Sequence, residues 1–168
     1  MRKFRTLIGN RRGTATIEFA LMSLFMFGTT MVALDFGFYT QQKMKLGSAV
    51  EQAAILAYNK KIGTSAATSD TSLISNYVRD YSGLKTTPTA AIKCNGTTAC
   101  GDGRCSCINA TTGAISVVGT CNAVCTGSAS YSGNYLQITA TATYNSVIVP
   151  DTYLGGKTMT QTAVVRLQ

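Results

Sequence analysis

The sequence predicts an α+β protein, in which a long N-terminal transmembrane helix continues into a small disulfide-stapled domain with an antiparallel sheet. Three observations support this fold class. An apolar run without any charge, from Phe19 to Leu34, follows a strongly basic start of the chain. All six cysteines fall within residues 94–125. Near the C-terminus, residues 136–144 and 159–167 alternate apolar and polar side chains, which is the period of a half-buried strand.

The first thirteen residues form a basic leader, which we expect to lie in the cytoplasm. Five of the fifteen Lys and Arg residues lie there, and none of the seven Asp and Glu residues does. A basic segment ahead of an apolar helix stays on the cytoplasmic side of a membrane. The remaining cations are scattered, without the basic stripe of a nucleic-acid-binding protein. The charge pattern therefore predicts membrane lipid as a partner and no nucleic acid.

The apolar run is long enough to cross a membrane once it is extended on both sides. Residues 19–34 rise about 24 Å as a helix, slightly less than a hydrocarbon core of about 30 Å. We therefore expect a transmembrane helix over residues 14–39, with Glu18 and Asp35 near the two interfaces, where a charge costs less than at the midplane. An interfacial aromatic cluster is expected at the second interface: Phe36, Phe38 and Tyr39.

A cleaved secretory signal peptide is the competing interpretation of residues 1–40. The apolar run is long for a signal peptide, and no clear Ala-x-Ala site follows it. A retained helix predicts a single-pass protein of the inner membrane, with its N-terminus cytoplasmic and its C-terminal domain periplasmic.

The helix is expected to continue through residues 40–60, so that one helix runs from about Thr14 to about Asn59. This stretch lacks proline, and apolar residues recur along one narrow stripe: Leu46, Val50, Ala53 and Ala57. The stripe packs either against the chain's own soluble domain or against neighbouring subunits, and the sequence leaves both open.

Residues 61–168 are expected to form the extracytoplasmic α+β domain. A linker over 62–72 precedes a short helix that ends at Gly83. Residues 114–118 offer one strand. The two alternating C-terminal segments are expected to be antiparallel neighbours, because the link between them is rich in turn residues. One face of the short helix carries its apolar side chains: Leu73, Ile74, Tyr77, Val78 and Tyr81.

The cysteines are expected to form disulfides. An even number in one Gly-, Thr- and Ser-rich stretch is typical of an oxidising compartment. Zinc is the alternative, but the chain has no CxxC pair and no His. Cys105 and Cys107 are separated by one residue and should have different partners, and the pairing is otherwise open among the six: Cys94, Cys100, Cys105, Cys107, Cys121 and Cys125.

No catalytic residue, metal site or cofactor is expected. His, the commonest general base and metal ligand, is absent. The sequence has no nucleophile elbow and no P-loop. The Asn-x-Thr sites at Asn95 and Asn109 are expected to be ordinary loop residues. An enzyme is therefore not expected.

The segment around Gly13 resembles the processing site of type IV prepilins: a basic leader, then GTATIEF, then an apolar helix. A longer pattern resembles the TadE-like group of tight-adherence pilus proteins. It comprises R-x-G-x4-E-F-A over residues 11–20, the Asp-Phe-Gly at 35–37, a Gln- and Ala-rich extension, and the late ITATATY strand with its Pro-containing turn. The resemblance covers residues 11–60 well and 134–168 loosely, and the cysteine segment lies outside it.

The resemblance implies cleavage after Gly13 by a membrane prepilin peptidase, which makes Thr14 the new N-terminus. The freed α-amine is largely cationic near neutral pH, and Glu18 offers it a partner in a low-dielectric setting. The alternative is that Glu18 only complements the N-terminal dipole of the helix and reaches toward water.

Two classes of function follow. The first is a minor pilin, pseudopilin or assembly subunit of a tight-adherence (type IVc) pilus, with other pilus subunits, assembly-machine membrane proteins and the peptidase as partners. The second is an uncleaved single-pass anchor that displays a disulfide-rich binding domain.

Overall fold

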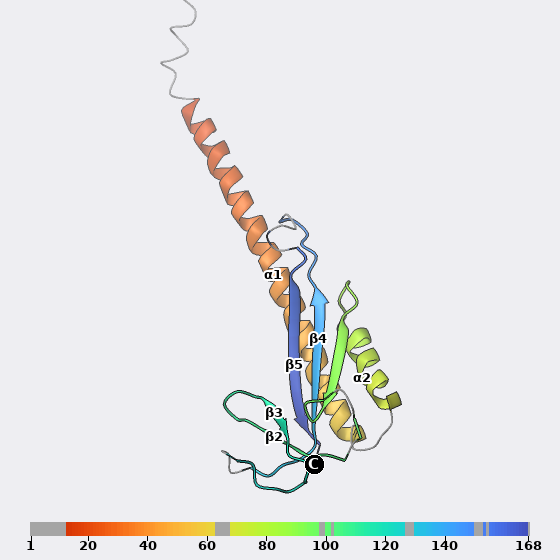
Figure 1. The fold of residues 1–168 in the computed structure, drawn as a ribbon. Coiled ribbons are helices and arrows are strands. Elements are labelled where there is room, and N and C mark those ends of the chain that lie inside the picture. The colour runs from red at the N-terminus through yellow and green to blue at the C-terminus, as the bar shows by residue number, and fades with distance from the viewer. Residues whose placement is uncertain are drawn as a thin grey trace, which may run out of the picture.

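The computed structural model describes residues 13–62, 68–97, 100–101, 103–126, 130–149, 153 and 155–167. The basic leader, except Gly13, lies outside these residues, as do residues 63–67 of the predicted linker. Residues 68–72 of that linker are helical instead, because α2 begins at Thr68. The described elements follow one another along the chain: α1 (Thr14–Lys60), α2 (Thr68–Tyr81), β1 (Thr89–Cys94), β2 (Ser106–Ile108), β3 (Ile115–Val117), β4 (Tyr135–Thr143) and β5 (Thr158–Arg166). The N-terminal part of α1 projects beyond the domain, and its C-terminal part packs against the sheet (Figure 1). The predicted α+β class is confirmed.

Helix α1 is continuous over 47 residues and ends one residue beyond its predicted end at Asn59. It ends because Lys61 adopts a left-handed conformation with φ of 51°. The next N–H, of Ile62, then donates to the carbonyl of Ala57 at 3.0 Å, and the Ile62 side chain is buried. This is a Schellman cap, which satisfies carbonyls of the last turn and adds an apolar contact.

The main sheet has the strand order β1-β4-β5, and both strand pairs are antiparallel. The two alternating C-terminal segments are β4 and β5, each shifted by one residue from the predicted bounds. On β4, the apolar positions from Leu136 to Ala142 are buried, while threonines line the other face and bond to threonines of neighbouring strands. Strand β3 falls within the predicted 114–118 and pairs with β2. Strands β1 and β2 were not predicted.

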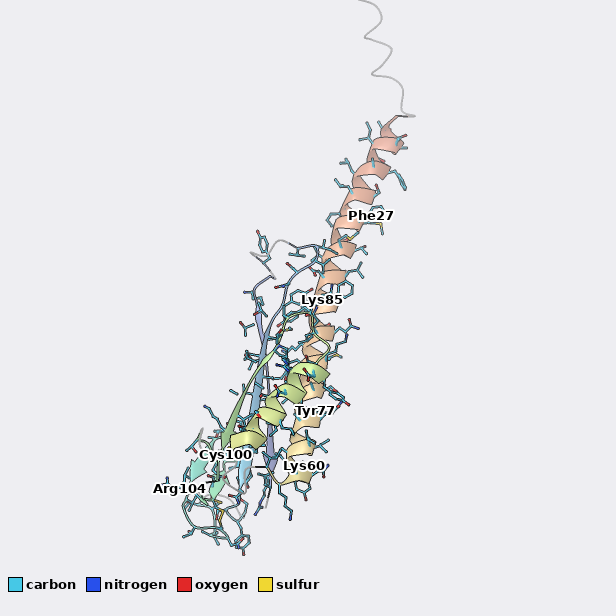
Figure 2. All side chains as sticks on the ribbon, turned by 90° about the vertical axis from the view of Figure 1, so that its right-hand side faces the viewer. Phe27, Lys60, Tyr77, Lys85, Cys100 and Arg104 are labelled. Atoms are coloured by element: carbon cyan, nitrogen blue, oxygen red, sulfur yellow. A yellow bond between two sulfur atoms is a disulfide. The ribbon has the colours of Figure 1, made fainter. Side chains whose placement is uncertain are left out.

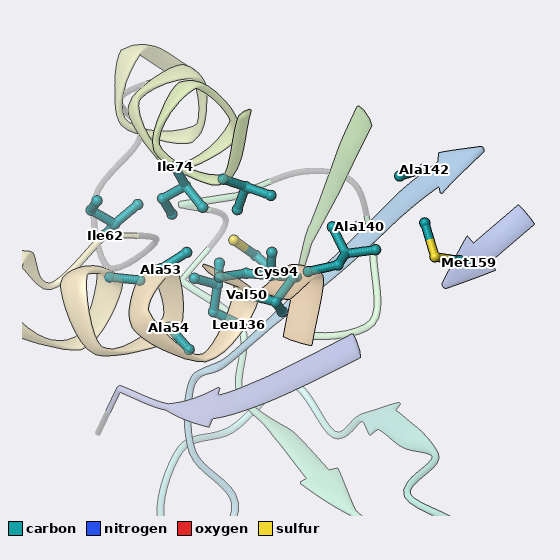
Figure 3. Close-up of a cluster of buried hydrophobic side chains, with 14 of the residues drawn as sticks. Val50, Ala53, Ala54, Ile62, Ile74, Cys94, Leu136, Ala140, Ala142 and Met159 are labelled. Atoms are coloured by element: carbon teal, nitrogen blue, oxygen red, sulfur yellow. The ribbon is translucent and has the colours of Figure 1, made fainter. Parts of the chain in front are cut away.

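The core lies between α1, α2 and β4 (Figure 3). All four residues of the apolar stripe on α1 are buried there, so the stripe packs against the chain's own domain. Helix α2 contributes Ile74 and Val78, which are both buried, whereas Leu73 and Tyr81 are exposed. Its apolar face is therefore narrower than predicted, because Tyr81 stacks on Tyr77 outside the core. Gly83 follows the helix with φ of +58°, as expected of a helix stop.

Candidate functional site

The N-terminal part of α1 stands free of the domain. Residues 14–34 are exposed except for the half-buried Ser23, and Phe27 projects from this segment in Figure 2. Twenty-one helical residues rise about 31 Å, which matches the thickness of a bilayer core. By length and composition, α1 is able to cross a membrane, and its apolar window is not buried within the chain.

The predicted processing residues lie at the tip of this segment. Gly13 caps α1 with φ of −85° and ψ of −21°, and it has no side chain to accept a capping hydrogen bond. Thr14 begins the helix. Glu18 lies in the second turn, exposed, and makes no hydrogen bond or ion pair with another residue that the structure describes. The three positions therefore share one end of α1, and a partner for Glu18 has to come from outside the described chain.

A second polar site marks the place where α1 meets the domain. Asp35 is the first buried residue of α1, with none of its surface exposed. The Tyr144 hydroxyl donates to its carboxylate at 2.6 Å and lies 3.0 Å from its backbone carbonyl. Three successive backbone N–H groups, of residues 147–149, donate to the same carboxylate at 3.2, 3.4 and 2.9 Å. This junction, Asp35 with Tyr144 and the loop 145–149, ties the end of β4 to α1.

The junction holds one negative charge without a cation. Peptide N–H groups that converge on a carboxylate form an anion nest, and charge-assisted hydrogen bonds are about twice as strong as neutral ones. Burial of Tyr144, followed by its hydrogen bond to Asp35 and the charge of that carboxylate, raises the pKa of Tyr144 to about 12. The phenol therefore stays a hydrogen-bond donor at any physiological pH.

Aromatic side chains surround the junction unevenly. Tyr39 is half-buried and meets the Tyr144 ring edge-on, with ring centroids 5.3 Å apart. Phe36 and Phe38 are exposed. The Phe36 ring stacks on Tyr39, with centroids 6.3 Å apart, so these two members of the predicted aromatic cluster contact each other, while Tyr39 also packs inside the domain.

The cysteines occupy the opposite end of the molecule. They form three bonds, Cys94–Cys100, Cys105–Cys121 and Cys107–Cys125. The predicted disulfides are confirmed, and Cys105 and Cys107 have different partners. In the part of the chain that the structure describes, no group of three or more Cys, Asp or Glu side chains is placed to hold a metal ion.

Asn95 fastens the cysteine-rich segment to the sheet. Its side chain donates to the Arg104 carbonyl at 2.6 Å and accepts from the Tyr135 N–H at 2.9 Å. It is buried and has φ of 51°, so it is not the ordinary loop residue that the sequence suggested. Asn109 does behave as a loop residue, since it is exposed and caps a local turn through the N–H groups of Thr111 and Thr112.

Residues 13–54 match the family model described as TadE-like protein. This segment of the chain is TadE-like. The match confirms the resemblance derived from the residues around Gly13 and is consistent with a protein associated with a tight-adherence pilus. No curated protein and no solved structure matches the chain. The TadE-like segment ends within α1, so the sheet and the disulfides lie outside the matched region.

The TadE-like segment contains both polar sites of α1. Glu18 was assigned a role from the sequence, whereas Asp35 was expected to lie near a membrane interface and was part of the Asp-Phe-Gly element of the resemblance, without a partner. The signal that pointed to Asp35 was weak: one acid ends a long charge-free run, and one tyrosine ends the alternating strand 109 residues later. Only the fold brings the two together.

Proposed function

We propose that this protein is a minor pilin, pseudopilin or assembly subunit of a tight-adherence pilus, and that a prepilin peptidase cleaves it after Gly13. One observation carries the proposal. The TadE-like match begins at Gly13, which is also where α1 begins, at the tip of an exposed apolar segment of bilayer length. A scissile bond at this position lies outside any folded domain and is open to a membrane peptidase.

In this role, Glu18 acts after cleavage. The new α-amine of Thr14 carries a positive charge near neutral pH. When the free part of α1 enters a bundle of similar helices, that charge needs a carboxylate close by. Glu18 is one turn further along the same helix and has no partner among the described residues, so it is available to an amine of its own chain or of a neighbour.

The remaining parts of the chain support a structural role. Residues 14–34 cross the inner membrane, with the leader in the cytoplasm and the domain in the periplasm or, after assembly, on the filament. The disulfides suit that oxidising side. The partners are other pilus subunits and assembly-machine membrane proteins, and the chain performs no catalysis.

The test is the N-terminus of the mature protein. Gly13→Leu should block maturation, because a peptidase needs close approach to the backbone, which a missing Cβ allows. Gly28→Leu is the matched control: Gly28 lies within the free part of α1 with open space around it, so processing should continue. N-terminal sequencing of membrane-purified protein should find Thr14 in the wild type. Finding the intact leader in cells with an active peptidase would refute cleavage.

The second candidate is an uncleaved anchor for a binding domain. Apolar side chains exposed at the cysteine-rich end favour it, since such residues suit a binding surface: Val117, Val118, Val124 and Tyr131. This candidate predicts that the leader remains and that Gly13→Leu changes nothing, so the same sequencing experiment separates the two.

A further inference from the structure

The loop 145–149 after β4 holds apolar side chains out of the domain. Val147 is 70% exposed and Ile148 is 42% exposed. Their backbone N–H groups bond to the Asp35 carboxylate, so the chain is fixed while these two side chains remain uncovered. An apolar pair presented on an anchored backbone indicates a surface that contacts something outside the chain.

The position of this loop relative to α1 suggests what it contacts. Asp35 directly follows residues 14–34, the free segment whose length matches a bilayer core. The hydrogen bonds to Asp35 therefore place the loop beside the turn of α1 at which a membrane span ends. Figure 1 shows the link between β4 and β5 beside α1, at the end of the domain from which the free helix emerges.

Other side chains at this level have the chemistry of a membrane interface. Phe36 and Phe38 on α1 are 57% and 43% exposed. A cleft of about 590 Å³ opens between α1, the loop 145–149 and the segment before β1. Phe38 and Val147 line it together with polar residues, and Lys85 is the cation among them. In Figure 2, Lys85 lies toward the end of the domain from which the free part of α1 emerges.

We propose that the loop 145–149, together with Phe36 and Phe38, seats the domain on the lipid surface, with Val147 and Ile148 in the interfacial layer and Lys85 among the headgroups. Aromatic and apolar side chains next to a cation are the combination that anchors proteins at this depth. The inference rests on the membrane span of the proposed function. It adds a contact that orients the domain, which a span alone does not do.

Depth-dependent quenching tests the proposal, because the chain contains no tryptophan and one introduced Trp reports without background from another. The full-length protein is placed in phosphatidylcholine vesicles with lipids brominated either near the headgroup or deep in the acyl chain. Val147→Trp should be quenched most by the shallow bromines, with a blue-shifted emission. Phe36→Trp, an aromatic exchange that leaves the loop intact, should give the same depth, so that a folding defect in one variant does not decide the result.

Two further variants separate this proposal from the span itself. Leu24→Trp lies in the free part of α1 and should be quenched most by the deep bromines. Val124→Trp lies at the cysteine-rich end. Val124 is 71% exposed, close to the 70% of Val147, and the introduced Trp should be quenched only by aqueous acrylamide. If lipid quenches Leu24→Trp but neither Val147→Trp nor Phe36→Trp, the domain does not contact the lipid surface, whereas the membrane span is still supported. Loss of lipid quenching at Leu24→Trp overturns both. Shielding of Val147→Trp from acrylamide without lipid quenching shows that protein covers the loop, which also overturns the proposal.

Discussion

At the level of single residues, Asp35 joins the free part of α1 to the sheet. Its carboxylate collects one phenolic and three peptide donors, all from residues 144–149. Because the donors are fixed by the end of β4, the charge is held without a mobile cation. The charged side chain that follows the apolar part of α1 therefore links the helix to the end of β4.

Tyr144→Phe should weaken the junction between α1 and the end of β4. The variant keeps the ring that packs against Tyr39 but removes the shortest hydrogen bond to the buried carboxylate. A buried acceptor that loses a donor costs about 1–3 kcal/mol. We expect a loss of unfolding free energy of that size for the detergent-solubilised protein in urea. The control is Tyr58→Phe, at an exposed position on α1, whose unfolding free energy should stay within about 0.5 kcal/mol of the wild type.

The same variant should change the alkaline titration. Tyr144 has a folded-state pKa of about 12, above its ordinary value of 10.0. Its contribution to stability is therefore complete below about pH 10 and is lost as the pH rises through about 12. Near-ultraviolet tyrosinate absorbance should show an ionisation near pH 12 that is missing in Tyr144→Phe. An unchanged late step in the variant would mean that another tyrosine is the protected one.

Glu18→Ala should leave membrane insertion and cleavage intact and abolish assembly. Removing a charge from an apolar helix lowers the cost of insertion, whereas the Thr14 amine then lacks its carboxylate in a packed bundle. Glu51→Ala is the control, since it removes an exposed acid from the domain half of the same helix. Complementation of piliation in a deletion strain, with processing checked by blot, gives the readout. Normal pili from a stable, cleaved Glu18→Ala protein would reduce Glu18 to a helix-end residue.

Sequence reasoning reached one of the two polar sites of α1. Glu18 and Gly13 belong to one short sequence pattern, so a role for Glu18 could be proposed from residues within one and a half helical turns. Asp35 depends on Tyr144 and on three backbone groups of a distant loop, which no local pattern encodes. Asn95 was missed for the same reason, since its partners at Arg104 and Tyr135 become neighbours only when the sheet forms.

At the level of elements, α1 combines two surfaces along one helix. Its first part exposes large apolar side chains on all sides, and its second part buries small ones along a stripe. Alanines at the stripe allow the sheet and α2 to approach the helix closely. The extent of α1 was predicted almost to the residue because residues 40–60 lack proline and continue an apolar stripe, and both features were visible in the sequence.

Ala53→Leu should disrupt this close approach. Ala53 is fully buried in the core, so three added carbons force neighbouring side chains to move, at a cost of about 1–3 kcal/mol. Glu51→Leu introduces the same side chain at an exposed position two residues earlier and should be nearly neutral. Urea unfolding of both variants provides the comparison. Equal stability of the two would show that the helix and sheet pack more loosely than the burial of Ala53 indicates.

Apart from β3, which lies within the predicted 114–118, strands were predicted only where their own side chains alternate over a long stretch. Strand β4 has nine residues with a clear period of two, so it was found. Strand β1 has six residues, two of them adjacent alanines, and its exposure shows only partial burial. Strand β2 has only three residues. Its Cys107 is held by the disulfide to Cys125, and its Ser106 pairs with the backbone of Gly133. Short strands of this kind follow from tertiary contacts.

At the level of the whole molecule, the two ends have different kinds of stability. The end from which the free part of α1 emerges is held by hydrogen bonds and packing, whereas the far end is held by three disulfides with sequence separations of 6, 16 and 18 residues. Each disulfide contributes about 2–4 kcal/mol by restricting the unfolded chain.

Protein isolated from its native compartment should therefore have no free thiol after denaturation without reductant. Digestion without reduction, followed by mass spectrometry, should recover peptides linked as Cys94–Cys100, Cys105–Cys121 and Cys107–Cys125. Disulfide mapping of protein reoxidised in vitro serves as the control for scrambling. Stoichiometric zinc or six reactive thiols would contradict the oxidised state.

Because α1 is continuous, a rotation of its free part is transmitted along the helix to the far end of the domain. About 25 residues, or roughly 38 Å, separate Asp35 from the end of α1 at Lys60, and the sheet packs against this part of the helix. Membrane helices commonly tilt by about 20°, and a tilt of that size moves the far end sideways by roughly 13 Å. Small rotations imposed on the lipid-embedded part would then reach the cysteine-rich end as displacements wider than a helix, with no hinge between to absorb them.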